Sequence, residues 1–135
     1  MSSVENRTLE GWVRSRIRQR TVLVVDDHAE LRLTLQELLE RRGYAVRLAE
    51  NGVVGLEQLR NGRIHAVVLD IDMPVMNGRA FLAALAADAE LSHVPVVVFS
   101  ADPQPARLPA GVSAWIWKGT ESADLLAALA AHEVR

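Results

Sequence analysis

From residue 21 onward, apolar residues fall into two kinds of segment that alternate along the chain. Short continuous runs rich in β-branched residues predict strands buried on both faces, as in a parallel sheet. Between these runs, apolar residues recur at helical spacing and predict helices that pack one face on the sheet. The predicted strands span 22–25, 44–48, 64–69, 94–99 and 114–117, and the predicted helices span 29–42, 51–59, a segment from 78 and a segment around 125–129. This alternation predicts a doubly wound α/β domain with five parallel strands.

The first 20 residues differ from the rest of the chain in charge. They contain five arginines and two glutamates, so they are basic, whereas the remainder of the chain is acidic. Four of their apolar residues fall near helical spacing, namely Leu9, Trp12, Val13 and Ile17. Two interpretations fit this segment: an arm that binds nucleic acid or a partner protein, and a solvated extension without a docking role. We therefore divide the chain into a basic N-terminal extension, 1–20, and one domain, 21–135.

Composition and charge exclude several classes of protein. The 135 residues suffice for one domain with its own core, and half of them are apolar. The formal net charge of -2 gives no general attraction to nucleic acid or to an anionic membrane. Cysteine is absent, which removes disulfides and thiolate chemistry. The chain has no apolar run of the roughly 18 residues that span a bilayer, so we expect no membrane anchor and no signal peptide. We expect a cytoplasmic protein with no membrane partner and no dedicated nucleic-acid site.

Polar side chains follow the predicted strands at the edge where open parallel sheets bind ligands. Asp26 and Asp27 end the first strand, Asp70 ends the third, Ser100 the fourth and Lys118 the fifth. Carboxylate oxygens are ligands that Mg²⁺ prefers, and a group of like charges is stabilised by a cation. An aspartate can also act as a nucleophile towards a phosphoryl group whose oxygens are neutralised by a metal ion and a lysine. The strand ends therefore favour phosphoryl chemistry at one rim of the sheet.

Four stretches of sequence carry a family resemblance: LVVDD (23–27), VVLDIDMPVMNG (67–78), VVVFSA (96–101) and WIWKG (115–119). In order and spacing they resemble the receiver domain of response regulators in two-component signalling, over residues 21–135. The second stretch is the most specific, because it places an aspartate at a strand end before Met-Pro and a glycine. The resemblance implies a (βα)5 flavodoxin-like fold with strand order 2-1-3-4-5, as in chemotaxis regulators.

The resemblance also implies a phosphoacceptor and a cofactor. Asp70 would receive a phosphoryl group from a histidine kinase or a histidine phosphotransfer protein, as one step of a phosphorelay. Mg²⁺ would be held directly by Asp27, Asp70 and the backbone carbonyl of Asp72, and through water by Asp26. The four histidines are scattered along the chain, and we expect them at the surface or at helix caps rather than among metal ligands.

Three further residues have implied roles in the switch. Ser100 would be the switch hydroxyl, Lys118 the counter-ion of the phosphoryl group, and Trp115 the aromatic residue that changes position on activation. Trp115 stands where the family has Tyr or Phe, so a switching ring and plain core packing both fit. Phosphorylation would change the conformations that the chain populates, and a downstream protein that the sequence does not identify would read the change. We expect a binding switch that assists only its own phosphotransfer and dephosphorylation, not an enzyme.

Two departures from the family pattern affect the expected output. Gly119 stands where the family usually has Pro, so we expect a looser loop after Lys118. Three prolines lie between the fourth and fifth strands, where the family has its fourth helix, and they predict a short, distorted or missing helix: Pro103, Pro105 and Pro109. Many receivers dimerise or bind effectors through that helix, so a homodimer remains one option without a predicted surface.

Two other functions stay open. Asp70-Ile71-Asp72 after an apolar strand also resembles the nucleophile motif of haloacid-dehalogenase-type phosphatases, although that motif usually opens the fold. The second alternative is a degenerate receiver that acts as a phosphorylation-independent scaffold. The altered fourth helix favours the scaffold, and the complete set of acidic, serine and lysine residues opposes it. Because one helix follows Lys118, we expect either a stand-alone receiver or part of a larger regulator.

Overall fold

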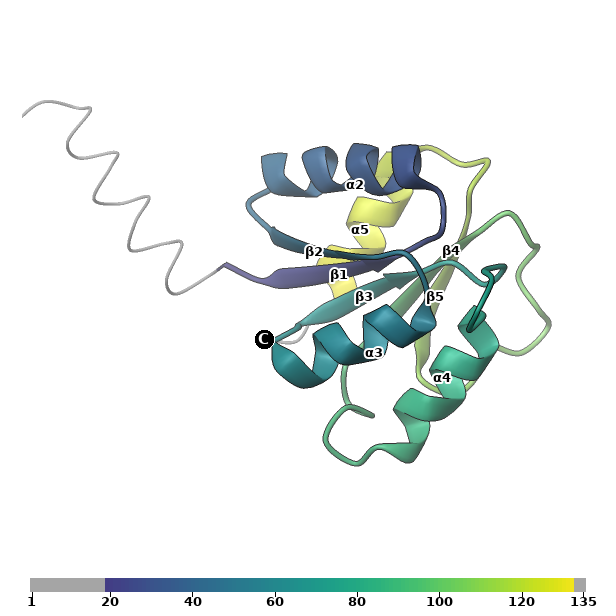
Figure 1. Cartoon of the computed structure of the whole chain (residues 1–135). Helices are drawn as coiled ribbons and strands as arrows, with labels where there is room; N and C mark the ends of the chain where they lie inside the picture. The colour runs from purple at the N-terminus through teal and green to yellow at the C-terminus, as the bar shows by residue number, and fades with distance from the viewer. Residues whose placement is uncertain (1–18, 133–135) are drawn as a thin grey trace, which may run out of the picture.

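Residues 19–132, which the computed structural model describes, form a central parallel sheet with helices on both faces (Figure 1). The strands are β1 (Thr21–Val25), β2 (Ala45–Ala49), β3 (Ala66–Leu69), β4 (Val96–Ser100) and β5 (Val112–Trp117). The helices in this part of the chain are α2 (Ala29–Arg41), α3 (Gly52–Asn61), α4 (Gly78–Ala87) and α5 (Ser122–His132). Every strand pair is parallel, in the order β2-β1-β3-β4-β5. The predicted doubly wound α/β fold and its strand order are confirmed.

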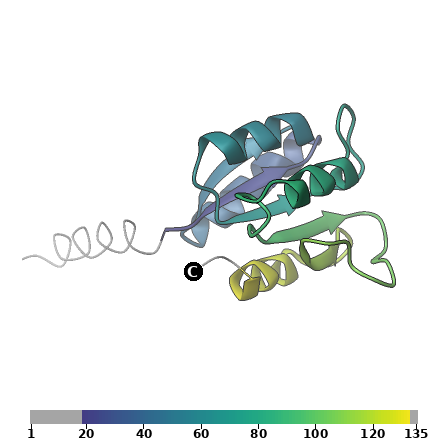
Figure 2. The same ribbon diagram turned by 90° about the horizontal axis from the view of Figure 1, so that it is seen from below.

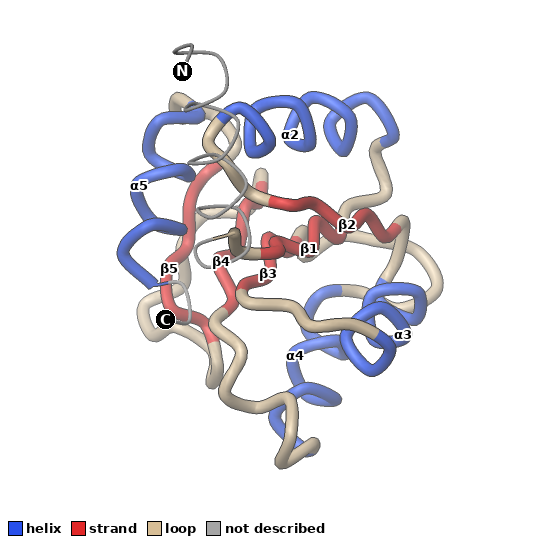
Figure 3. The backbone as a smooth tube through the Cα atoms, turned by 90° about the vertical axis from the view of Figure 1, so that its left-hand side faces the viewer, coloured by secondary structure: helices blue, strands red, loops and turns tan. Residues whose placement is uncertain are grey.

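The sheet separates two apolar layers. On one face, α3 and α4 cover a layer that includes Leu56 and Phe81. On the other face, α2 and α5 cover a layer that includes Leu39 and Leu125. Figure 3 shows the two helix pairs on opposite sides of the strands, and Figure 2 shows α3 and α4 nearest the viewer with α2 behind. Because β1, β3 and β4 are buried on both faces, their sequences are continuously apolar rather than alternating.

Two strands begin later in the structure than the apolar pattern predicts. Ile64 and Val94 head the predicted third and fourth strands, but β3 begins at Ala66 and β4 begins at Val96. Both side chains are buried in the layer on the α3–α4 side, although their backbones lie in the loops that lead into the strands. Apolar burial therefore does not distinguish a strand from the loop residues that precede it.

The connection between β4 and β5, residues 101–111, contains bends and turns but no helix. This confirms the prediction of a short, distorted or missing fourth helix, for which the three prolines give the physical reason. Two tryptophans on the same face of β5 hold the start of the connection. The indole N–H of Trp115 donates to the carbonyl of Asp102 at 3.0 Å, and that of Trp117 donates to the carbonyl of Ala101 at 3.2 Å. Side chains of β5 thus order a segment that has no helical hydrogen bonds of its own.

No helix within residues 19–132 is long and apolar enough to cross a membrane. The predicted basic extension, 1–20, lies outside the described residues except for its last two positions. The last three residues of the predicted domain, 133–135, also lie outside them. The division of the chain at residue 21 therefore stays a prediction.

Candidate functional site

The carboxyl ends of the strands bring three of the predicted charged residues together. Asp26 follows β1, Asp70 follows β3 and Lys118 follows β5, and β1 and β3 are neighbours in the sheet. Lys118 Nζ lies 2.9 Å from Asp26 Oδ2 and 3.4 Å from Asp70 Oδ1. Asp26 is 2% exposed and Asp70 is 4% exposed. The parallel topology therefore builds a buried ion-pair cluster from residues up to 92 positions apart in the chain.

The cluster contains two buried carboxyl groups, Asp26 and Asp70, but only one lysine to balance them. Burial, together with the negative charge of Asp26, raises the pKa of Asp70 from 3.8 to about 6, against the opposing effect of Lys118. Burial acts to lower the pKa of Lys118, but its hydrogen bond to Asp26 and the charges of Asp26 and Asp70 outweigh this, so that pKa lies above its usual value. Lys118 is therefore charged at neutral pH, and the Asp70 carboxylate is held in a place where a further cation would stabilise it.

Four side chains at this rim offer ligand atoms that all lie within 4.8 Å of one another: Asp26, Asp27, His28 and Asp70. Asp27 Oδ1 is buried and accepts no hydrogen bond from the described residues, although the ring nitrogen of His28 lies 3.2 Å from it. A buried carboxylate oxygen without a hydrogen bond, next to two further carboxylates, fits a divalent cation. The structure thus brings together the three side chains that were predicted to bind Mg²⁺. Asp72 lies two residues beyond Asp70 on the loop after β3, with an exposed side chain.

The predicted switch residues meet at one residue of the β4–β5 connection. Ser100, at the end of β4, is fully buried, and its Oγ accepts a hydrogen bond from the backbone N–H of Asp102 at 3.1 Å. Trp115 is buried in the layer on the α3–α4 side, and its indole donates to the carbonyl of the same Asp102. The hydroxyl and the aromatic ring are therefore linked through the backbone of a single residue.

Two residues that the sequence pattern did not single out contact the site. His28 Nδ1 lies 3.1 Å from Asp26 Oδ1 and 3.2 Å from Asp27 Oδ1. His28 is exposed and stands at the N-cap of α2, as expected of the histidines, but its ring also lies beside the two carboxylates. Arg32 Nη1 donates to the backbone carbonyl of Asp26 at 2.7 Å. Their positions in the sequence could have indicated these contacts, because His28 directly follows the two aspartates and Arg32 lies one helical turn further along α2.

Two backbone features shape the loop between β3 and α4. Gly78 begins α4 so close to β3 that a Cβ atom there would lie 2.6 Å from the carbonyl oxygen of Asp70, so any other residue would push the helix away. Val75 has a φ of 69°, and the N–H of Met76 donates to the carbonyl of Pro74 at 2.8 Å, which closes a γ-turn. A β-branched side chain is strained in this conformation. The loop beside Asp70 is thus tightly constrained.

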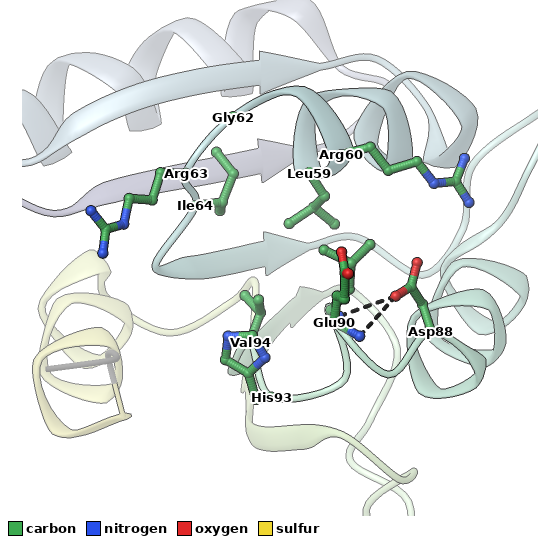
Figure 4. Close-up of a pocket in the computed structure, with 10 residues that line it drawn as sticks. Leu59, Arg60, Gly62, Arg63, Ile64, Asp88, Glu90, His93 and Val94 are labelled. Carbon is green, nitrogen blue, oxygen red and sulfur yellow. Dashed lines mark hydrogen bonds between the residues drawn. The ribbon is translucent and has the colours of Figure 1, made fainter.

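Two surface hollows lie at opposite ends of the sheet. One has a volume of about 470 Å³ and adjoins the acidic cluster through His28 and Lys118. The other has a volume of about 500 Å³ and is lined by the end of α3 and by the loops that lead into β3 and β4 (Figure 4). Its charged side chains are Arg60, Arg63, Asp88 and Glu90, and Figure 4 shows the two arginines pointing in opposite directions. Because these charges do not converge, we assign no chemistry to the second hollow.

Comparison with known proteins gives one family. Residues 22–130 match the family model of the response regulator receiver domain. The sensory/regulatory protein RpfC of Xanthomonas campestris pv. campestris is 36% identical over 123 residues, which are 87% of this chain and 17% of that protein. The chemotaxis protein CheY-3 of Vibrio cholerae is 33% identical over 109 residues, which are 77% of this chain and 84% of that protein. A solved structure of the chemotaxis response regulator CheY4 of Vibrio cholerae matches with a TM-score of 0.77 and 26% identity, covering 84% of this chain and 98% of that chain.

Proposed function

Because the chain belongs to the response regulator receiver domain family, we propose that it is a phosphorylation-dependent switch of two-component signalling, with Asp70 as the phosphoacceptor. Receiver domains are signalling domains rather than enzymes that turn over a substrate. The observation that carries the proposal is the buried cluster at the carboxyl ends of β1, β3 and β5. There the Asp70 carboxylate lies 3.4 Å from Lys118 Nζ, and its ligand atom lies within 4.8 Å of those of Asp26 and Asp27.

In the proposed reaction, an Asp70 carboxylate oxygen attacks the phosphorus of a phosphohistidine on a histidine kinase or a phosphotransfer protein. The P–N bond breaks, its electron pair stays on the imidazole nitrogen, and that nitrogen takes up a proton. Lys118 faces the incoming phosphoryl oxygens as a movable point charge. Asp27, Asp70 and the backbone carbonyl of Asp72 would hold Mg²⁺, with Asp26 bound through water. The ion would neutralise charge on the carboxylates and the phosphoryl group.

Phosphorylation of Asp70 would change the conformation of the β4–β5 connection. The Ser100 hydroxyl, which now accepts from the Asp102 N–H, would donate to the phosphoryl group instead. Asp102 then loses one of the two bonds that fix it, and its carbonyl remains attached to the Trp115 indole. This would change the surface of residues 101–111 and β5, where a downstream protein would bind.

The test is phosphorylation by acetyl phosphate with Mg²⁺, followed by intact mass. We expect the wild type to gain one phosphoryl group, and to gain none when Mg²⁺ is chelated. Asp70→Asn should gain none, whereas Asp124→Asn, the same change at an exposed carboxylate of α5, should behave like the wild type. Equal phosphorylation of Asp70→Asn and the wild type would refute the assignment of Asp70. Steady turnover of p-nitrophenyl phosphate would show a phosphatase instead.

The missing helix between β4 and β5 favours one second function, a receiver fold that binds its partner without phosphorylation. Hydrogen exchange of residues 101–111, measured with and without acetyl phosphate and Mg²⁺, separates the two functions. A switch changes the protection of this segment when Asp70 is phosphorylated. A scaffold keeps the same protection in both states, even if Asp70 is chemically modified.

A further inference from the structure

His28 is held against the acidic cluster by its own backbone as well as by its ring. Its backbone N–H donates to Asp26 Oδ1 at 2.9 Å, and its Nδ1 lies 3.1 Å from the same oxygen and 3.2 Å from Asp27 Oδ1. The side chain is 68% exposed, so core packing does not explain where the ring lies. It precedes α2 without making a side-chain capping bond. What the ring does contact is the pair of carboxylates.

A ring nitrogen of His28 and one oxygen from each of Asp26, Asp27 and Asp70 lie close enough together to be ligands of one ion. Mg²⁺ prefers oxygen ligands and would not coordinate the imidazole nitrogen. Imidazole nitrogen is a good ligand for Ni²⁺, Zn²⁺ and Cu²⁺. We propose that His28 is a nitrogen ligand that makes this site bind transition-metal ions such as Ni²⁺ selectively over Mg²⁺. The inference rests on the proposed function, because it uses the same carboxylates.

The same contacts also fit a role in which the ring of His28 competes with metal ions instead of binding them, and the experiment has to distinguish the two roles. Without a metal ion, the Nδ1–H of His28 can donate to Asp26, and the ring then competes with every cation for those carboxylates. Removal of a competitor would raise the affinity for Ni²⁺ and Mg²⁺ together. Removal of a residue that only shapes the β1–α2 loop would lower both affinities together. A nitrogen ligand is distinguished by a loss that affects Ni²⁺ and not Mg²⁺.

The experiment is calorimetric titration of the tag-free full chain with NiCl2 and, separately, MgCl2, supported by thermal unfolding with each salt. The variants are His28→Ala and His28→Asn. Asparagine keeps a hydrogen-bond donor for the carboxylates and is favoured at the position before a helix, so it isolates the loss of the imidazole. The matched control is His93→Ala, because His93 is an exposed histidine in the hollow at the other end of the sheet (Figure 4). Asp27→Asn tests the carboxylate part of the site.

We expect both His28 variants to bind Ni²⁺ at least about tenfold more weakly than the wild type, with Mg²⁺ affinity unchanged. His93→Ala should match the wild type for both ions. Ni²⁺ affinity that is unchanged in the His28 variants, or that moves in parallel with Mg²⁺ affinity, would overturn the proposal. If the acidic cluster does not bind metal ions at all, the wild type will bind neither Ni²⁺ nor Mg²⁺, and Asp27→Asn will show the same lack of binding.

Discussion

Replacement of Asp70 by asparagine should stabilise the metal-free protein at neutral pH, although it removes the proposed phosphoacceptor. The side chain is almost fully buried, and burial together with Asp26 disfavours its charged form more strongly than Lys118 favours it. Asparagine has nearly the same shape and no charge. The substitution therefore removes an unfavourable buried charge and leaves the packing around it in place.

The size of the effect follows from the pKa of Asp70, which is about 6 in the folded protein against 3.8 for an ordinary aspartate. A difference of about 2.2 corresponds to about 3 kcal/mol, since each pKa unit is worth about 1.4 kcal/mol. Because the folded state binds the proton more tightly, the free energy of unfolding falls as the pH rises from about 4 to above 6, and then levels off. The excess stability of Asp70→Asn should be about 1 kcal/mol at pH 4.5 and about 3 kcal/mol at pH 7.5.

The assay is urea unfolding in EDTA at a series of pH values, followed by circular dichroism. The difference between wild type and variant cancels the other groups that titrate over this range. Asp124→Asn, at an exposed carboxylate, should show no such pH-dependent difference. Mg²⁺ should narrow the gap between the wild type and Asp70→Asn, because a bound cation stabilises the native carboxylates. A variant that is less stable than the wild type at pH 7.5, or a gap that does not change with pH, would refute the reasoning.

Two further substitutions test the loops around the site. Val75→Gly should raise the free energy of unfolding by about 1 kcal/mol, because the φ of 69° strains a β-branched residue. The Val75 side chain is 82% exposed, so its removal loses little packing. A lower urea midpoint in the variant would contradict this. Gly119→Ala should lower the free energy of unfolding by about 1 kcal/mol and change the tryptophan emission, because its Cβ would overlap the ring of Trp117 and force that indole off the carbonyl of Ala101. In a Trp117→Phe background the cost should shrink, and an equal cost in both backgrounds would exclude the ring as its cause.

Local rules explain what the sequence determines by itself. A run such as Val22–Val25 is apolar at every position and rich in β-branched residues, which is typical of a strand buried on both faces, so the parallel sheet and its layers were predictable. Prolines exclude a regular helix wherever they fall in its interior, so the altered connection between β4 and β5 was predictable too. The positions of Asp26, Asp70, Ser100 and Lys118 at strand ends followed from the same sheet, because parallel strands present their carboxyl ends at one edge.

The tertiary structure decides what depends on the direction of side chains, on their distances in space and on their burial. Lys118 pairs most closely with Asp26, not with Asp70, and no spacing in the sequence distinguishes the two. The raised pKa of Asp70 comes from burial, which local pattern does not measure. His28 joins the carboxylates because the β1–α2 loop turns its ring back over them. Gly119 stands in place of the family's proline where the ring of Trp117 leaves no room for a Cβ atom. Each of these features depends on how side chains are placed in three dimensions, so local sequence patterns do not predict it.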